Sequence, residues 1–394
     1  MDTGKKTAFQ FIILFGVVSL FGDMTYEGAR SITGPYLALL GASAAVVGLV
    51  AGFGEFMGYA LRLASGYLAD RTERYWLITI IGYALLLSIP LLAFVGYWEL
   101  AALLVILERM GKAIRTPSRD TMLSHATKQL GRGWGFGIHE ALDQVGAIIG
   151  PLTLAAVFLL KGGYPEAFTI LWVPAFLTLV ILMVARFAFP SPEKFEASER
   201  TTGRSIKGKG RLSKVFWFYV LFTFLSVMGF AHFQLISYHL KVQSVLPDVE
   251  IPIFYAIAMG VDALVALGIG KTYDKIGLIS LATVPLLSLP IPFLAFSHSY
   301  ALAIIGVILW GAVMGIQETI MRAAVADLTP AARRGVAYGI FNTAYGASWF
   351  LGSTFMGLLY EIGTGYLILF VVMATFISVP ILFLVNKQAL SAKL

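Results

Sequence analysis

Long apolar runs separated by short polar segments dominate the chain. A helix needs roughly 20 mostly apolar residues to cross about 30 Å of hydrocarbon. Runs of that length predict helices at residues 8–40, 44–69, 75–97, 98–117, 133–160, 165–189, 214–240, 250–271, 277–298, 299–323, 334–360 and 364–386. The pattern therefore predicts an all-α polytopic membrane protein with twelve transmembrane helices.

Two polar patterns recur about 200 residues apart, which is the mark of an internal duplication. The second apolar run ends in Gly66-Tyr-Leu-Ala-Asp70-Arg71-Thr-Glu73-Arg74, and the eighth ends in Gly270-Lys-Thr-Tyr-Asp274-Lys275-Ile-Gly277. The segment 132–138 before the fifth run resembles 334–340 before the eleventh. Parallel repeats of this kind are a known plan of membrane transporters.

The longest polar stretch, residues 190–213, contains proline, glycine and charges of both signs. We interpret it as a cytoplasmic linker between two pseudo-symmetric six-helix bundles. The predicted domains are therefore an N-terminal bundle at 1–189, the linker at 190–213 and a C-terminal bundle at 214–394.

Lysine and arginine gather in the segments on one side of the predicted membrane, which by the positive-inside rule is the cytoplasm. That side holds Lys5, Lys6, Arg71, Arg74, the basic residues of 112–132, 194–214 and 322–334, Lys271, Lys275, Lys387 and Lys393. The other side holds Lys161 and Lys241. We expect an integral protein of a prokaryotic cytoplasmic (inner) membrane with both termini in the cytoplasm.

Composition supports the membrane assignment, with 58% hydrophobic residues, 13% charged residues and a mean hydropathy of +0.82. The net charge of +7 faces anionic lipid headgroups, so we expect the bilayer and a small-molecule substrate as partners, without nucleic acid. The chain has no cysteine, which excludes disulfides and thiolate metal ligands. We expect a monomer with no cofactor and no metal, energised by the proton gradient.

The loop at 66–74 resembles the G-x-L-A-D-R-x-G-R signature of the major facilitator superfamily, because Gly66, Asp70, Arg71 and Arg74 occupy their places. Glu73 stands where that family usually has glycine. The second copy retains Gly270, Asp274 and Gly277 and has Lys275 in place of arginine. The resemblance implies a cytoplasmic gate, closed by charge-assisted hydrogen bonds that break when this side opens. The alternative is an ordinary charged turn.

A second resemblance lies on the predicted fifth helix, where Gly146, Gly150 and Pro151 match the G-x-x-x-G-P motif of exporters and proton antiporters in the same superfamily. Leu154 and Ala155 replace its usual trailing glycines. Physically, the two glycines permit close helix packing and the proline can bend the helix. A generic packing seam is the alternative interpretation.

Ionisable residues inside the predicted helices are the main candidates for function, because a charge at the bilayer centre costs about 2.5–3.5 kcal/mol on insertion scales. The predicted proton-coupling and substrate-cavity residues are Asp23, Glu27, Arg30, Glu55, Arg62, Arg109, Glu140, Asp143 and Asp262. Three further bases, Lys112, Arg115 and Arg119, follow Arg109 toward the cytoplasm. We interpret them as topology anchors, and a functional role is the alternative.

The candidate set, with Glu108 added, holds more acids than the three arginines can neutralise. We therefore expect some carboxyl groups to be hydrated or protonated, and a carboxyl that exchanges protons with both aqueous phases can couple protons to transport. The hypothesis is that Asp23, Glu27, Glu140 and Asp143 include the proton-carrying site. The alternative is that these acids only hold helices together through salt bridges.

Aromatic residues are frequent on the predicted seventh helix: Phe216, Trp217, Phe218, Tyr219, Phe222, Phe224, Phe230, Phe233 and Tyr238. With Trp310 on the predicted tenth helix, they could line an apolar substrate surface. The alternative is that they face lipid or fill the core. The segment His139-Glu140-Ala-Leu-Asp143 resembles the H-E-x-x-H of zinc peptidases. No other motif offers an obvious further ligand, and twelve duplicated helices are not what a protease needs, so we expect no enzyme.

These observations predict a secondary active transporter that works by alternating access. The leading interpretation is proton-coupled export of an amphipathic drug or metabolite. The alternative is proton-linked uptake of an organic anion or similar nutrient, with Arg30, Arg62 or Arg109 binding its anionic group.

Overall fold

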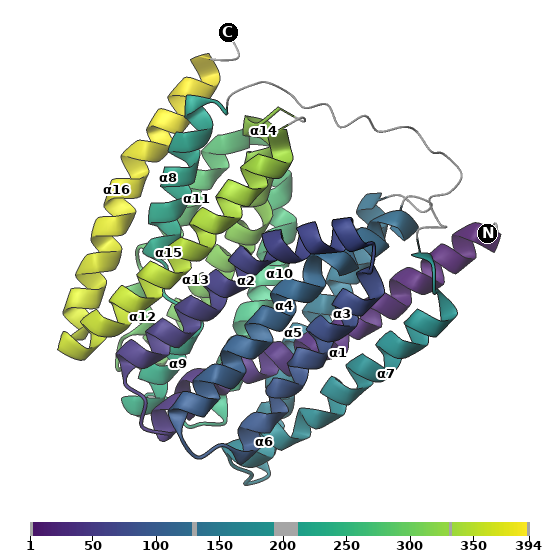
Figure 1. Cartoon of the computed structure of the whole chain (residues 1–394). Helices are drawn as coiled ribbons and strands as arrows, with labels where there is room; N and C mark the ends of the chain where they lie inside the picture. The colour runs from purple at the N-terminus through teal and green to yellow at the C-terminus, as the bar shows by residue number, and fades with distance from the viewer. Residues whose placement is uncertain (1–2, 128–131, 193–211, 331–332, 392–394) are drawn as a thin grey trace. The chain divides into compact units, whose positions relative to one another are not determined.

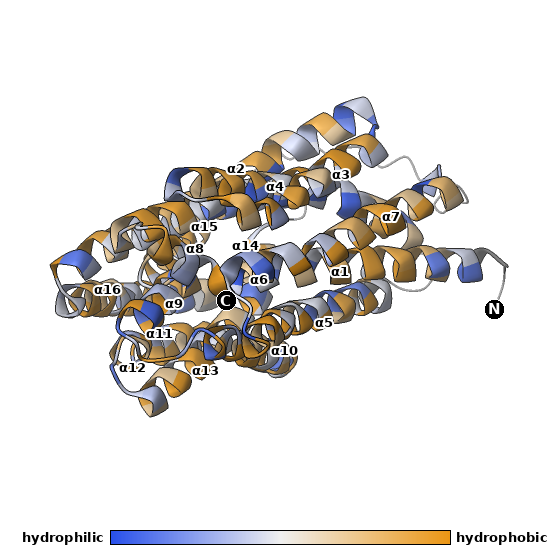
Figure 2. Ribbon diagram, turned by 90° about the horizontal axis from the view of Figure 1, so that it is seen from below, coloured by the Kyte–Doolittle hydropathy of each residue, from blue (hydrophilic) through white to orange (hydrophobic). Residues whose placement is uncertain are grey.

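The structure is a computed structural model that describes residues 3–127, 132–192, 212–330 and 333–391 (Figure 1). Within these ranges the secondary structure is helical throughout, and no strand occurs. Figure 2 shows hydrophobic residues along most of the length of the helices and hydrophilic residues gathered near many of their ends.

Among the described residues, the N-terminal half is built from these α-helices and 3₁₀ segments: α1 (Thr3–Leu39), α2 (Ala44–Thr72), α3 (Tyr75–Ala84), η1 (Leu85–Ser88), η2 (Pro90–Phe94), α4 (Trp98–Thr127), α5 (Arg132–Leu159), α6 (Tyr164–Ile170) and α7 (Trp172–Ala188). The 75–94 span is thus one α-helix followed by two tighter turns. The 164–188 span is two helices that meet at Leu171.

The elements of the C-terminal half in the described ranges are α8 (Lys214–Met228), α9 (Phe233–Val242), α10 (Glu250–Ile276), the 3₁₀ segment η4 (Gly277–Ala282), α11 (Thr283–Ser288), α12 (Ile291–Ala295), α13 (Tyr300–Ile316), the π-helical η5 (Gln317–Met321), α14 (Arg322–Leu328), α15 (Arg334–Ile362) and α16 (Thr364–Ser391). Several predicted spans are therefore interrupted helices.

By length and hydropathy, nine segments of the described chain can cross a membrane. One of them, Glu250–Ala295, is 46 residues long and turns at Gly277, so it comprises two crossings. The helices α4 and α15, with 30 and 29 residues, are long enough to cross a membrane as well, although they are not among these nine segments. Counting these two helices and the two crossings confirms the twelve predicted spans.

The predicted end of the fourth span at residue 117 is wrong, because α4 continues to Thr127. Pro117 lacks the N–H that would donate to the Ala113 carbonyl. The hydroxyl of Ser65 on α2 donates to that carbonyl at 2.9 Å instead, and the helix runs on. The extension carries His125 and the polar residues around it away from the apolar part of the helix.

Contacts divide the chain into two compact units. The first contains Met1–Ile32 and Ala60–Gly203, and the second contains Thr33–Tyr59 and Arg204–Leu394. The end of α1 and the first part of α2 thus pack with the C-terminal helices. Most of the predicted linker at 190–213 lies outside the described residues, and the division into bundles at 1–189 and 214–394 stays a prediction.

The internal duplication is repeated in the packing of each unit. In the first unit Gly150 on α5 lies against the backbone of Met24 on α1. In the second unit the matching Gly352 on α15 lies against the backbone of Met228 at the end of α8. A side chain larger than hydrogen would collide with a main chain at either position, so the same close helix approach is built twice.

Each unit has its own apolar core. In the first unit the core joins α1, α3, α4 and α7 around Phe11, Phe15 and Trp76. In the second unit Trp310 stacks on Phe230 at 5.8 Å, and its indole N–H donates to the Ala231 carbonyl at 2.8 Å. Both are fully buried, so the core interpretation of these aromatic residues is confirmed. The same holds for Phe216, Tyr219, Phe222 and Phe233, whereas Trp217 is exposed.

Candidate functional site

The first unit contains a cluster of cations around one tyrosine, Tyr26 on α1. The guanidinium of Arg109 lies 4.3 Å from the centre of the Tyr26 ring, and the ammonium of Lys112 lies 4.1 Å from it. Arg30 approaches the same ring at 6.0 Å and pairs with Glu27 at 3.5 Å. The negative face of the ring stabilises these cations, with Tyr26 only 3% exposed. The cluster brings together three predicted residues, Glu27, Arg30 and Arg109.

A buried ion pair on α4 lies beside this cluster. Arg115 is 2% exposed and Glu108 is 1% exposed, and their charged groups lie 3.5 Å apart. The Arg115 guanidinium also lies over the ring of Tyr83 at 4.7 Å. A topology anchor would place its charge among headgroups, so the anchor interpretation is wrong for Arg115.

A second polar chain connects α1, α4 and α5. Arg119 pairs with Asp120 at 2.9 Å and donates from Nη1 to the Ser19 hydroxyl at 3.3 Å. Ser19 is hydrogen-bonded in turn to Nε2 of His139 at 2.8 Å. These hydrogen-bonded side chains lie on the side of α5 that carries Asp143, and Asp143 interacts with Ser19 and Arg119.

The carboxylates of Asp23 and Asp143 repel each other, and both interact with Lys112, Arg115 and Arg119. Lys112, Arg115 and Arg119 therefore offset much of the acid excess that the sequence indicates. Asp23 and Asp143 remain two acids that share one site, where a single bound proton would relieve their repulsion.

One predicted residue, Glu140, lies differently from expectation. Glu140 is exposed, although we expected it inside the protein with Asp143. The reason is helical geometry, since His139 takes the buried position on α5 and its immediate neighbour points elsewhere. Arg62 on α2 is partly buried in the first unit.

His139, Glu140 and Asp143 place their ligand atoms within 4.8 Å of one another, close enough to share one metal ion. In the structure, however, Nε2 of His139 is hydrogen-bonded to Ser19. We therefore describe His139 as part of the polar chain.

The second unit holds Glu55 and Asp262 in separate places. Glu55, on α2, lies 3.6 Å from Nε2 of His232, at the break between α8 and α9. The ring of Trp349 packs edge-on against His232 at 4.9 Å. Asp262 on α10 is 4% exposed and lies against Gly315 of α13.

A small cavity in the second unit adjoins the π-helical segment η5. Its lining combines aromatic rings with polar groups, from Tyr59, Gln317, Glu318, Arg322, Phe341 and Tyr345. The Tyr345 hydroxyl donates to Oε1 of Gln317 at 3.2 Å, while Nε2 of Gln317 is buried without a hydrogen-bond partner. Single π-helical turns are frequent at functional sites, because they turn side chains out of the regular helical register.

The predicted gate residues lie at the ends of α2 and α10. Asp70, Arg71, Arg74, Asp274 and Lys275 are exposed, and in the described part of the chain no ion pair links them. Gly66 faces Pro117 on α4, and its counterpart Gly270 faces Thr319 in η5, so both copies pack the same way. The backbone φ is positive at both Glu73 and Gly277, at 54° and 62°.

The predicted glycine and proline motif of α5 packs against α1. Gly146 faces the backbone of Leu20, and Gly150 faces that of Met24 and Gly28. Pro151 is accommodated inside α5, which continues to Leu159. The glycines therefore let α1 and α5 approach closely beside Asp23 and Asp143.

Sequence reasoning missed three parts of this arrangement: the role of Tyr26, the burial of Arg115 and the pairing of His232 with Glu55. Tyr26 does share a helix face with Asp23 and Arg30, at spacings of three and four residues, which was a usable signal. The other two depend on contacts between distant segments that no local pattern records.

Comparison with known proteins agrees with the fold. The family model of the Major Facilitator Superfamily matches residues 15–353 and 287–393. A chain of Mycobacterium tuberculosis described as an uncharacterized protein is 44% identical over 96% of this chain and 94% of its own length. An uncharacterized MFS-type transporter of Methanocaldococcus jannaschii is 29% identical over 89% of this chain and 88% of its own.

Solved structures show the same fold at low identity. A bacterial homolog of the human lysosomal transporter Spinster, in an inward-facing and unoccupied conformation, gives a TM-score of 0.75 at 14% identity, over 99% of this chain and 98% of that one. The nucleoside transporter NupG gives 0.72 at 14% identity, over 96% and 98%.

Fold and family together define an integral membrane transporter with twelve helices in two six-helix bundles. The chain belongs to the major facilitator superfamily. This is a family of transporters and not an enzyme class.

Proposed function

We propose that the protein couples proton movement to the export of an amphipathic drug or metabolite by alternating access. The observation that carries the coupling is the pair Asp23 and Asp143, two acids that repel each other within one charged cluster. One proton bound between them would change the charge of the cluster, and hence the balance between conformations that expose it to either side.

The direction and the class of substrate rest on two further features. The Gly146, Gly150 and Pro151 motif, which resembles that of exporters, packs on α1 beside these acids. The cavity beside η5 joins aromatic rings to charged groups, but its volume of about 10 Å³ has room for no more than a water molecule. It would have to widen in another conformation to hold a ligand with an apolar body and a polar end. The aromatic residues of α8 and α9 do not support this inference, since most of them are buried in the core.

The first test is thermal stabilisation of the purified protein by a panel of amphipathic compounds and organic anions, at about pH 5.5 and about pH 8, because a ligand raises the stability of the state it binds. We expect hits whose effect depends on pH and is lost in Asp23→Asn or Asp143→Asn. Asp248→Asn is the matched control, because Asp248 pairs with Lys241 and belongs to the second unit, whereas the cluster belongs to the first.

Proteoliposomes that carry a pH gradient then test coupling with the compound found. Gradient-driven flux should disappear in both variants, while flux down the compound's own gradient persists. Coupled flux that survives neutralisation of Asp23, Glu27, Glu140 and Asp143 together would refute the coupling site.

A second candidate is proton-linked uptake of an organic anion, for which the observation is the convergence of Arg30, Arg109 and Lys112 on Tyr26. Three cations in one place can hold a carboxylate, and a planar guanidinium does so with two parallel hydrogen bonds. Arg62 remains a further candidate for this role. Stabilisation by anions that is lost in Arg109→Gln, with no response to amphipathic compounds, would favour uptake.

A further inference from the structure

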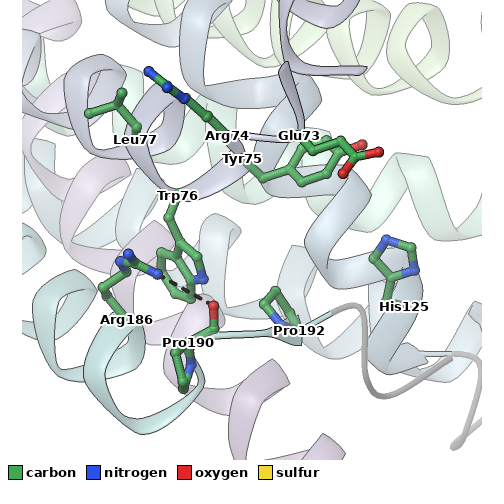
Figure 3. Close-up of a pocket in the computed structure, with 9 residues that line it drawn as sticks. All are labelled: Glu73, Arg74, Tyr75, Trp76, Leu77, His125, Arg186, Pro190 and Pro192. Carbon is green, nitrogen blue, oxygen red and sulfur yellow. Dashed lines mark hydrogen bonds between the residues drawn. The ribbon is translucent and has the colours of Figure 1, made fainter. Parts of the chain in front are cut away.

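A cavity of about 630 Å³ opens at one end of the first unit, apart from the charged cluster (Figure 3). It is lined by the α2–α3 turn and by the ends of α4 and α7, through Glu73, Arg74, Tyr75, Trp76, Leu77, His125, Arg186, Pro190 and Pro192. Its volume is within the range of small-molecule sites.

The lining is basic and aromatic. Arg74, His125 and Arg186 provide three cationic or protonatable groups against the single acid Glu73. Arg186 lies 5.7 Å from the Trp76 ring and donates from Nη1 to the Pro190 carbonyl at 3.4 Å, the bond drawn in Figure 3. These contacts hold its guanidinium at the cavity wall, where it can bind an anion.

An apolar groove of about 410 Å³ is lined in part by Phe189, the residue before Pro190. It is lined by Phe9, Gln10, Ile13, Leu14, Ala188 and Phe189. Phe189 lines the groove and Pro190 lines the basic cavity, so the two spaces flank the same short segment after α7. The Phe189 ring is fixed edge-on against Phe11 of α1 at 5.4 Å.

The cavity lies where α2, α4 and α7 end and α3 begins, which is the predicted cytoplasmic side. Headgroups of anionic lipids meet the protein at this depth, and basic pockets between transmembrane helices bind them. A phosphate in the cavity and an acyl chain in the groove would use both spaces, whereas a free phosphate would use the first alone.

We propose that this paired site binds an anionic phospholipid, with its phosphate at Arg74 and Arg186 and one acyl chain beside Phe9 and Phe189. Trp76 supports the headgroup end, as aromatic residues do at membrane interfaces. The site uses none of the residues of the charged cluster around Tyr26.

The test measures thermal unfolding of the full-length protein in detergent with added phosphatidylglycerol, phosphatidylcholine or inorganic phosphate. We expect phosphatidylglycerol to raise the unfolding temperature clearly more than the other two additives. The response should fall by at least half in Arg74→Gln/Arg186→Gln. It should persist in Arg74→Lys/Arg186→Lys, which keeps both charges, and in the control Lys271→Gln, an exposed base of the second unit.

Native mass spectrometry of the same proteins gives a second readout that does not depend on stability. We expect retained phosphatidylglycerol on the parent chain and its loss from the double glutamine variant. Equal effects of phosphatidylcholine, an equal effect of inorganic phosphate alone, or a lipid response unchanged in the double glutamine variant would each overturn the proposal.

Discussion

At the scale of single residues, the two copies of the gate motif share a backbone feature that explains their difference in sequence. Glu73 and Gly277 occupy matching places, and both have positive φ, at 54° and 62°. Gly277 also has ψ of −139°, in a region that side chains rarely enter. The first copy accepts a glutamate at the cost of backbone strain, whereas the second retains glycine.

Replacing these residues should therefore have opposite effects. Glu73→Gly removes about 1–2 kcal/mol of left-handed strain, and the extra entropy of the unfolded chain costs about 0.5–1 kcal/mol, so we expect a stabilisation of up to about 1.5 kcal/mol. Gly277→Ala should destabilise by about 1–3 kcal/mol through the backbone alone, because no atom lies near its missing Cβ. Thermal unfolding measures both, and a destabilised Glu73→Gly would contradict the strain argument.

The buried pair of Glu108 and Arg115 makes a second prediction at this scale. Arg115→Met leaves the Glu108 carboxylate in the interior without its partner, which should destabilise by about 3–5 kcal/mol. Glu108→Leu combined with Arg115→Met removes both charges, so we expect the double variant to recover most of that loss. Unfolding of the single and double variants gives the coupling free energy. A double variant as unstable as Arg115→Met would indicate that packing of the long side chain matters more than charge.

At the scale of helices, close approach through glycine holds α1 against α5. Gly150→Ala would place a methyl group on the backbone of Met24 and Gly28, and the forced separation should destabilise by about 1–3 kcal/mol. Gly137→Ala is the matched control on the same helix, because no atom lies within 4 Å of its missing Cβ. There we expect a stabilisation of up to about 1 kcal/mol from helix propensity. Similar losses at both positions would show that propensity, not packing, controls α5.

Helix positions were predictable from hydrophobic length, because the bilayer fixes how many apolar residues a crossing needs. The interruptions were not predictable, since an apolar run reads the same whether its backbone is α-helical, 3₁₀ or π-helical. The break at His232 and the π-helical turn at Gln317 arise from packing against other helices. For the candidate site, the sequence indicated which charges lie inside, and tertiary contacts decide which of them meet, as Arg115 and Tyr26 show.

At the scale of the whole molecule, the duplication implies that both halves cross the membrane in the same orientation, which the absence of cysteine makes simple to test. Thr72 follows Arg71 of the first gate motif and Thr272 lies within the second, and both are exposed. Leu160 and Gln243 are exposed at the ends of α5 and α9. In single-cysteine variants, we expect a membrane-impermeant maleimide to label Leu160→Cys and Gln243→Cys from outside intact cells. Thr72→Cys and Thr272→Cys should react only in inverted vesicles. Because the positive-inside rule places both gate loops with the basic segments, labelling of Thr72→Cys and Thr272→Cys from opposite sides would refute the parallel repeat, and with it a pair of equivalent cytoplasmic gates.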